Sequence, residues 1–399
     1  MNGRSRQRGR AQNAFAVMRA LISLGRASRS ELAAQLGLDR STMTHITSAL
    51  LAARLIEAVA EAPAGSRGGR RAELLSVERS RYSILSAEVR SRSVRWLLTD
   101  LQGEPLADGT LGPSMPSAGG AVRRSWMEGV LADLRDIVRS HPDGRRVLGV
   151  GLALPGLFDR SRSRLVESFE LGLSDLDIAS VWNCDDPPLR AANDATCYAW
   201  REIAACRTEL SRGETTAADG VYVYTKLHTD GERFLPTGMG VGVIVVAEGR
   251  ILRGHRGAAG ELRGYGYTVR DADQLGVDLE QIRLRDGQQA AVNAAATELI
   301  RNLVVISSLL DPPRIVVAGD LGALGLEMRR LAADLVPPGQ VEIAFREPEL
   351  LAVAHGAAQM VVETLFSPES PALPLNELAG SDNRGTEFSY GYARVNTLQ

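Results

Sequence analysis

Apolar positions recur at helical spacing near the start of the chain. Their period of about 3.6 residues predicts an amphipathic helix over residues 14–24. The segment Ser28-Arg29-Ser30-Glu31 has the spacing of a capping box, so it predicts a second, short helix over residues 31–36 that stops at Gly37. The apolar positions of the first helix are Phe15, Val17, Met18, Leu21 and Ile22.

A third helix follows, capped by Asp39 or Ser41 and running to about Arg54. Its apolar positions predict an inner face made of Met43, Ile46, Ala49 and Leu50. The opposite face carries short hydroxyl side chains and one imidazole, with an arginine at its start. We expect these outward residues to be Arg40, Ser41, Thr42, Thr44, His45, Thr47 and Ser48.

Two strand-like segments come next, over residues 55–60 and 72–77. The residues between them are rich in glycine and arginine, which is typical of a hairpin tip that contacts phosphates or the minor groove of DNA. The candidate contacts of this tip are Arg67, Arg70 and Arg71.

Two short helices joined by a turn with glycine form the helix-turn-helix pattern, to which the hairpin adds a wing. The second helix of such a pair lies in the major groove, with its first residues near the base edges. We therefore predict that residues 13–80 form a winged helix-turn-helix that binds double-stranded DNA. The alternative is a small three-helix bundle whose polar face is only solvated.

Strands and helices alternate in the rest of the chain, which predicts an α/β fold. Ligands of such folds bind at the carboxyl ends of strands, where Pro155-Gly156, Asn193-Asp194 and Gly319-Asp320 lie. The expected strands cover residues 93–100, 147–154, 189–194, 220–225, 240–247 and 314–318, and the expected helices cover residues 122–140, 195–205, 288–310 and 350–365.

Charge separates the two parts of the chain. Residues 1–80 hold 13 arginines and 6 acidic residues, a net charge of +7, so the remainder carries −9 of the total of −2. A basic segment on an acidic body predicts a polyanionic partner for the first segment only. No apolar run approaches the ~18 residues of a membrane span. We expect a cytoplasmic protein without membrane contact.

The three cysteines are Cys184, Cys197 and Cys206, whose spacing fits neither a disulfide framework nor a zinc cluster. We expect them to be buried apolar residues.

In its motifs and their order the chain resembles the ROK family (repressors, open reading frames and sugar kinases), in its transcriptional-regulator branch. The resemblance runs from about residue 13 to residue 365 and implies an actin-like, ribonuclease H-like body with two α/β lobes around a cleft. The segments that carry it are Gly69-Arg70-Arg71 in the wing, residues 149–156, residues 192–196, residues 237–242, residues 257–261, residues 311–319 and residues 356–358.

The resemblance also implies roles for single residues. In ROK kinases the aspartate at the position of Asp194 is the general base, and a carboxylate there can equally bind sugar hydroxyl groups. Asn193 and Glu261 match sugar-binding positions, and Gly156 would let a sugar approach the backbone. The alternative for Asn193-Asp194 is capping of the following helix alone, and the two roles are compatible.

The nucleotide and metal sites of the kinases are not matched. The phosphate-binding turn corresponds here to Glu88-Val89-Arg90-Ser91-Arg92, which lacks glycine, and the second phosphate loop ends in Asp320, a carboxylate. Glu170 and Leu173 depart from the family pattern in another stretch. No histidine and no cysteine cluster follow Glu261, so a structural zinc site is not expected. We predict no metal, no cofactor and no enzymatic activity.

We expect a basic flexible tail over residues 1–12 and a disordered tail over residues 367–399. Between the winged helix and that last tail, residues 81–195 form a first lobe completed by residues 350–366, and residues 196–349 form a second lobe with the oligomer contact and the ligand cleft.

The predicted function is transcriptional repression of carbohydrate-related genes by a homodimer or homotetramer, with a sugar as effector. The alternatives are a ROK sugar kinase with a DNA-binding domain, and a regulator that no longer senses sugar.

Overall fold

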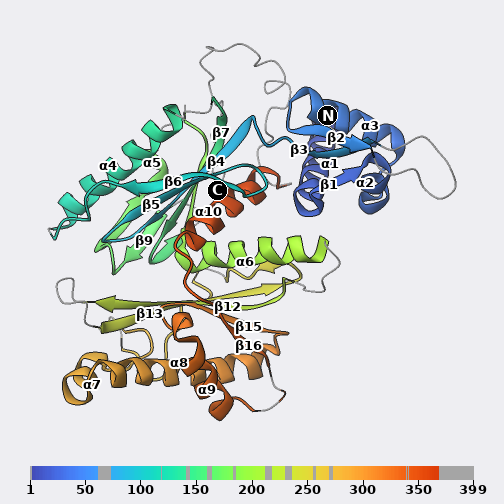
Figure 1. Cartoon of the computed structure of the whole chain (residues 1–399). Coiled ribbons are helices and arrows are strands. Elements are labelled where there is room, and N and C mark those ends of the chain that lie inside the picture. Colours follow the sequence, from blue (N-terminus) through green and yellow to red (C-terminus); the bar gives the residue numbers. More distant parts are fainter. Residues whose placement is uncertain are drawn as a thin grey trace.

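The computed structural model describes residues 2–61, 73–117, 119–140, 144–159, 164–182, 186–211, 218–229, 236–254, 258–268, 273–337, 339 and 341–367 (Figure 1). Its elements form three groups: a small N-terminal unit and two lobes, each built on a five-stranded sheet. This arrangement confirms the predicted class, a winged helix-turn-helix followed by a two-lobed α/β body.

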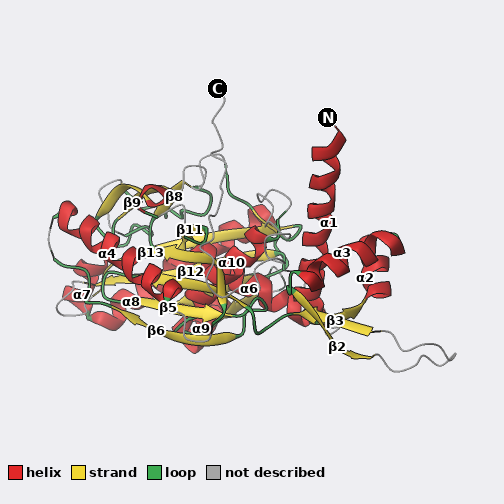
Figure 2. Cartoon of the chain, turned by 90° about the horizontal axis from the view of Figure 1, so that it is seen from above, coloured by secondary structure: helices red, strands yellow, loops and turns green. Residues whose placement is uncertain are grey.

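The N-terminal unit is a winged helix, seen at one side of the body in Figure 2. Its three strands form a sheet in the order β1-β3-β2. Strand β1 was not predicted, because three residues are too few for an alternating pattern. The elements are α1 (Asn2–Leu24), β1 (Arg26–Ser28), α2 (Arg29–Leu36), α3 (Arg40–Ala52), β2 (Ile56–Glu61) and β3 (Glu73–Val77).

Local signals set the boundaries of its helices as predicted. Ser28 accepts the backbone N–H of Glu31 at 3.3 Å, while the Glu31 carboxylate accepts the backbone N–H of Ser28 at 2.7 Å, which completes the capping box. Gly37 ends α2 with a φ of 64°, a conformation that glycine adopts at little cost. Asp39, and not Ser41, caps α3.

The flexible tail expected over residues 1–12 is wrong for residues 2–12, which continue α1 as a helix. Arginine, glutamine and alanine make up most of these residues and are strong helix formers, which explains why the helix extends beyond its apolar positions.

The first lobe is a sheet in the order β11-β7-β4-β5-β6. Its first strand lies at the centre, with an antiparallel hairpin on one side and two parallel strands on the other. A small antiparallel sheet, β8-β9-β10, was not predicted. The elements are β4 (Tyr82–Val89), β5 (Val94–Thr99), β6 (Pro105–Leu111), α4 (Gly120–Arg139), β7 (Arg146–Leu154), β8 (Leu157–Asp159), β9 (Arg164–Ser168), β10 (Leu173–Asp177), α5 (Ile178–Val181) and β11 (Leu189–Asn193).

The second lobe repeats this topology in the order β14-β13-β12-β15-β16, again with the first strand central and the same division into antiparallel and parallel neighbours. The repetition is what the actin-like resemblance implied. The elements are β12 (Gly220–Thr229), β13 (Pro236–Ala247), β14 (Arg250–Ile251), α7 (Leu279–Asp286), α8 (Gln288–Leu310), β15 (Ile315–Gly319), a 3-10 turn (Gly322–Leu324), α9 (Gly325–Leu335) and β16 (Ile343–Phe345).

Helix α8 is long and apolar enough to cross a membrane by length and composition. The expectation that no apolar run approaches that length is therefore wrong. The inward side chains of α8, among them Ala291, Leu299 and Leu303, are fully buried in the core of the second lobe, and this packing accounts for the apolar character of the helix.

Two helices, α6 (Asp194–Ser211) and α10 (Ala352–Leu365), lie side by side between the first sheet and the second (Figure 1). A Cβ atom at Gly356 of α10 would lie 1.7 Å from the Cys197 carbonyl oxygen of α6, so only glycine permits this approach. Because α6 begins at Asp194, the lobe boundary expected after residue 195 falls inside a helix. Cys197 and Cys206 are buried free thiols, as predicted, and Cys184 lies outside the described residues.

The winged helix shares one hydrophobic core with the body. Buried side chains of α1 and α3 pack with the end of α10, and the rings of Phe15 and Phe366 meet edge to face at 6.1 Å. The Tyr82 hydroxyl, at the start of the first lobe, donates to the Ala53 carbonyl at 2.7 Å. The two parts are therefore joined by packing and not only by the chain.

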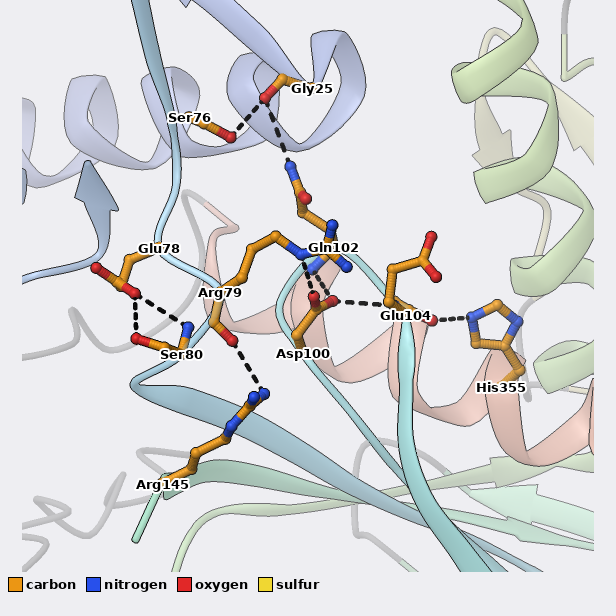
Figure 3. Close-up of polar contacts among 11 residues, drawn as sticks. Gly25, Ser76, Glu78, Arg79, Ser80, Asp100, Gln102, Glu104, Arg145 and His355 are labelled. Atoms are coloured by element: carbon orange, nitrogen blue, oxygen red, sulfur yellow. Dashed lines mark hydrogen bonds and ion pairs between the residues drawn. The ribbon is translucent and has the colours of Figure 1, made fainter. Parts of the chain in front are cut away.

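Polar contacts reinforce the same junction (Figure 3). Arg79, in the connection to the first lobe, donates to the fully buried carboxylate of Asp100 at 2.7 Å. Asp100 also accepts the backbone N–H groups of Gln102 and Glu104, which fixes the turn between β5 and β6. His355 of α10 bonds the carbonyl of that turn at 2.7 Å. The connection, the turn and α10 thus form one rigid corner.

Candidate functional site

The outward face of α3 begins at Arg40 and is exposed at Ser41, Thr44, His45 and Ser48. Among the residues that the structure describes, the side chains of Arg40 and His45 have neither a hydrogen bond nor an ion pair. Their donor groups are therefore available to an external acceptor, as expected of the second helix of a helix-turn-helix.

The hydroxyl groups of this face are less available than the sequence suggested. Ser41 and Thr42 both donate to Asp39 at 2.7 Å, and Thr44 donates to the Arg40 carbonyl at 2.8 Å. The hydrogen bonds from Thr42 and Ser41 hold the pKa of Asp39 well below its usual range. The three hydroxyls keep only lone pairs for a ligand, which leaves Arg40 and His45 as the principal donors.

Thr47 was predicted on the outward face, and this prediction is wrong. Thr47 is fully buried and donates to the Met43 carbonyl at 2.9 Å, while Arg29 donates to its hydroxyl at 3.0 Å. The buried positions of α3 are 43, 46, 47 and 50, the i, i+3, i+4, i+7 pattern of a helix face, so the polar side chain was misassigned on chemistry alone. Ala49, predicted to face inward, is exposed.

Arg29 lies beside this face and was missed. It pairs with Glu73 of β3 at 2.6 Å, and both line a hollow of about 290 Å³ together with Ser30, Arg40 and Thr44. The capping box at Ser28 was the available signal, because it places Arg29 in the first turn of α2. The wing residues Arg67, Arg70 and Arg71 lie outside the described residues, between the ends of β2 and β3.

The second region lies between the lobes, where β11 ends and α6 begins. The Asn193 side chain donates to the Gly156 carbonyl at 2.8 Å and accepts the backbone N–H of Ala195 at 2.8 Å. Asp194 accepts the same N–H at 2.9 Å. The structure thus shows the capping role of Asn193-Asp194, and it brings Gly156 to the same place.

Gly156 has a φ of 115°, and a Cβ atom there would lie 2.3 Å from the Glu167 carbonyl oxygen of β9. Protein backbone therefore already accounts for the absence of a side chain at Gly156. Its predicted role in admitting a sugar stays a prediction.

Glu261 reaches the same region from the second lobe. It forms a bridge to Gly242 of β13, where an added Cβ atom would lie 2.3 Å from the Cβ of Ala195. Glu261 accepts a hydrogen bond from Gln274 at 3.1 Å. Burial and the neighbouring Asp194 carboxylate raise the pKa of Glu261. The four predicted ligand positions, Gly156, Asn193, Asp194 and Glu261, are therefore neighbours in space.

Charged residues that were not predicted as ligands gather around Asp194. Arg90 donates to Glu88, its neighbour on β4, and to the Tyr224 hydroxyl of β12 at 2.6 Å. Lys226 of β12 donates to Glu170 at 2.5 Å, and Glu170 also accepts the backbone N–H of Ser91 at 3.1 Å. We call Glu88, Arg90, Glu170, Asp194, Tyr224 and Lys226 the inter-lobe cluster.

Burial dominates the electrostatics of Asp194. It raises the pKa of that carboxyl to about 6, although Arg90 and Lys226 oppose the shift. The pKa of Lys226 is lowered by burial and by Arg90. Asp320, at the end of β15, accepts the backbone N–H of Leu227 at 2.7 Å, so its carboxylate faces β12. The negative charge of a nucleotide phosphate would be repelled by the carboxylates of Asp194 and Asp320.

The described residues contain no group of three or more histidine, cysteine or acidic side chains that could hold a metal ion.

Parts of the chain are similar to known proteins. Residues 11–60 match the family model described as the IclR helix-turn-helix domain. Over 252 residues the chain is 20% identical to a protein from Caldicellulosiruptor sp. (strain Rt8B.4) that is named as a xylose repressor. That match covers 63% of this chain and 57% of the repressor, so it spans little more than half of the relative's length.

Solved structures agree with the fold. A crystal structure of a ROK family transcriptional regulator, a homolog of the E. coli MLC protein, superposes with a TM-score of 0.66 and 18% identity over 93% of this chain and 99% of that chain. A ROK family protein from Streptococcus pneumoniae TIGR4, solved with sucrose, superposes with a TM-score of 0.50 and 18% identity over 70% of this chain and 98% of its own. The chain therefore joins an IclR-type helix-turn-helix domain to a body with the fold of the solved ROK family proteins.

Proposed function

We propose that the protein is a cytoplasmic DNA-binding transcriptional repressor of carbohydrate-related genes, whose affinity for its operator changes when a sugar binds between the lobes. The observation that carries the DNA-binding part is the exposed face of α3, where Arg40 and His45 present donors without partners among the described residues. Arg67, Arg70 and Arg71 of the wing would add phosphate contacts.

Regulation requires that the two sites be connected mechanically. Asn193 and Asp194 open helix α6, α6 packs along α10, and Phe366 after α10 packs against Phe15 of α1. A ligand that moves the start of α6 would therefore act on the winged helix through packed side chains. It can shift operator affinity only as far as it prefers one arrangement of these helices over the other.

The body is proposed to lack kinase activity. Arg90 fills the turn where the kinases of the family hold phosphates, and Asp320 adds a carboxylate nearby. Asp194 would then bind hydroxyl groups instead of removing a proton from one. A homodimer or homotetramer reading a palindromic operator would fit the usual symmetry of such regulators.

The test measures binding of the full chain to duplex DNA by fluorescence anisotropy across a series of salt concentrations. The slope of log K against log salt is negative, and each lost phosphate contact lowers its magnitude by about 0.9. We expect Arg40→Ala to lower it by about one and the double variant Arg70→Ala, Arg71→Ala by about two. Arg330→Ala, an exposed arginine of α9, is the control.

Slopes equal to that of Arg330→Ala would contradict the DNA surface. In a separate experiment, genome-wide mapping of bound DNA would give the operator and its neighbouring genes. If none of those genes concerned carbohydrates, the proposed role in sugar metabolism would be contradicted.

A further inference from the structure

Two contacts cross from one lobe to the other within the inter-lobe cluster. Arg90, just after β4 of the first lobe, donates to the Tyr224 hydroxyl of β12 in the second. Lys226, two residues further along β12, pairs with Glu170 in the turn between β9 and β10 of the first lobe. Ser91 donates to the same carboxylate through both its backbone and its hydroxyl. The cluster is therefore built from residues of both lobes, which contact each other across the boundary between them.

These charges are shielded from water. The side chains of Glu88 and Glu170 are 5% and 9% exposed, and those of Arg90 and Lys226 are 17% and 19% exposed. A charge that loses its partner while it stays shielded from water is strongly destabilised. A shift of the lobes that moved Lys226 away from Glu170 before water reached either group would leave both without partners, so the pair favours the joined arrangement.

The cluster also selects among ligands by charge. Its three carboxylates, Glu88, Glu170 and Asp194, outnumber its two cations, and both cations are already paired. A phosphate group brought here would add negative charge beside an uncompensated carboxylate. A sugar hydroxyl, by contrast, can donate to Glu170 or Asp194 and accept from Lys226 without a change in net charge.

We propose that Arg90–Tyr224 and Lys226–Glu170 form a latch that holds the two lobes together in the absence of ligand, and that the ligand that opens it is an unphosphorylated sugar. The ligand class rests on the proposed sugar response, whereas the latch does not. A hydroxyl that takes the place of Lys226 on Glu170 loosens the attachment of β12 to the first lobe. Because α6 packs against both β12 and β13, the change reaches α6 and then α10.

Lys226 is the only lysine in the sequence, which makes the latch observable in the intact protein. Biosynthetic labelling with lysine carrying ¹³C at Cε gives one resonance, whose pH titration reports the pKa of Lys226. An opposite charge within hydrogen-bonding distance raises the pKa of an ammonium group by about 1–3 units. We therefore expect Glu170→Gln to lower the titration midpoint by about 1–3 pH units.

Glu167→Gln is the matched control, since Glu167 is an exposed glutamate on β9 of the same small sheet. Tyr224→Phe is the second variant, because it removes the acceptor of Arg90 in the second lobe while keeping the ring that stacks on Tyr198 at 5.3 Å. It is expected to shift the Lys226 resonance and to increase the radius of gyration measured by X-ray scattering. Midpoint and resonance changes no larger than those of Glu167→Gln would overturn the latch.

The ligand class is tested on the same resonance with D-xylose, D-glucose and glucose 6-phosphate as probes. A neutral sugar is expected to shift the resonance and the phosphate is not. The ligand class is overturned if only glucose 6-phosphate shifts the resonance, or if none of the three probes shifts it. Binding of duplex DNA, followed separately by anisotropy, shows whether the proposed DNA-binding function stands in either case.

Discussion

The α3 face and the inter-lobe cluster both gather polar side chains, but they treat them in opposite ways. On α3, Arg40 and His45 project into solvent without partners among the described residues. Between the lobes, Arg90 and Lys226 are each paired with a carboxylate of the chain itself. The first region is ready for an external partner, whereas a ligand of the second must displace bonds that the protein has already formed.

The largest effect is expected from a substitution that removes the packing between the winged helix, which carries the α3 face, and the body, which holds the inter-lobe cluster. Phe15→Ala removes the ring that meets Phe366 in the shared core, and such truncations cost about 3–5 kcal/mol. We expect the free energy of unfolding of the variant, measured with urea, to fall by that amount. In the wild-type protein we expect the winged helix and the body to unfold in one transition. Phe169→Ala, at a ring that is 68% exposed, should change it by less than about 0.5 kcal/mol. Two separate transitions in the wild-type protein would show that the parts are independent.

The second prediction sharpens the electrostatic side of the comparison. The folded pKa of Asp194 is about 6, above the unfolded value of about 3.9, so the folded state binds the proton more tightly. Stability from this group is complete below pH 4 and is lost as the pH rises through 6. Asp194→Asn should therefore be more stable than the wild type at pH 8, on the order of 1–2 kcal/mol, and similar to it near pH 4.

The measurement is urea unfolding at a series of pH values, read as the difference between variant and wild type. Asp334→Asn, which removes an exposed carboxylate of α9, is the control. A difference for Asp194→Asn that does not grow between pH 4 and pH 8 would show that burial does not govern this carboxyl.

The third prediction separates two neighbours on α3. Thr47→Val keeps the shape of the buried side chain but removes the acceptor of Arg29, so unfolding should become easier by about 1 kcal/mol. His45→Ala should change stability by less than about 0.5 kcal/mol, because His45 is exposed, and should weaken specific DNA binding by about 1–3 kcal/mol. Thermal unfolding and operator binding of both variants check this. If Thr47→Val weakened operator binding as much as His45→Ala does, without a change in stability, Thr47 would belong to the DNA-binding surface.

Local signals made much of the fold predictable. The capping box at Ser28, the cap at Asp39 and the largely apolar pattern of residues 288–310 each depend on residues close in sequence, and all three are present in the structure. Thr47 failed because its chemistry was weighed above its position in the helical period. Small strands such as β1 and β9 carry too few residues for a pattern.

The candidate ligand positions were predictable only where a motif marked them. Asn193, Asp194 and Glu261 matched family segments, and the structure makes them neighbours. Lys226 and Glu170 are 56 residues apart and sit on different lobes, and no local pattern links them. Pairs that depend on how two lobes meet require the three-dimensional structure.

The contact between Phe15 and Phe366 also constrains when the winged helix can complete its folding during synthesis. Side chains of α1 and α3 complete their core only with α10, which ends at Leu365, so the chain must be synthesised through α10 before the winged helix finds its last packing partners. A product broken off before Ala352 would retain the arginines of α3 and lack the helix that supports them. Under the proposed DNA-binding function, products that lack α10 would therefore bind operators poorly.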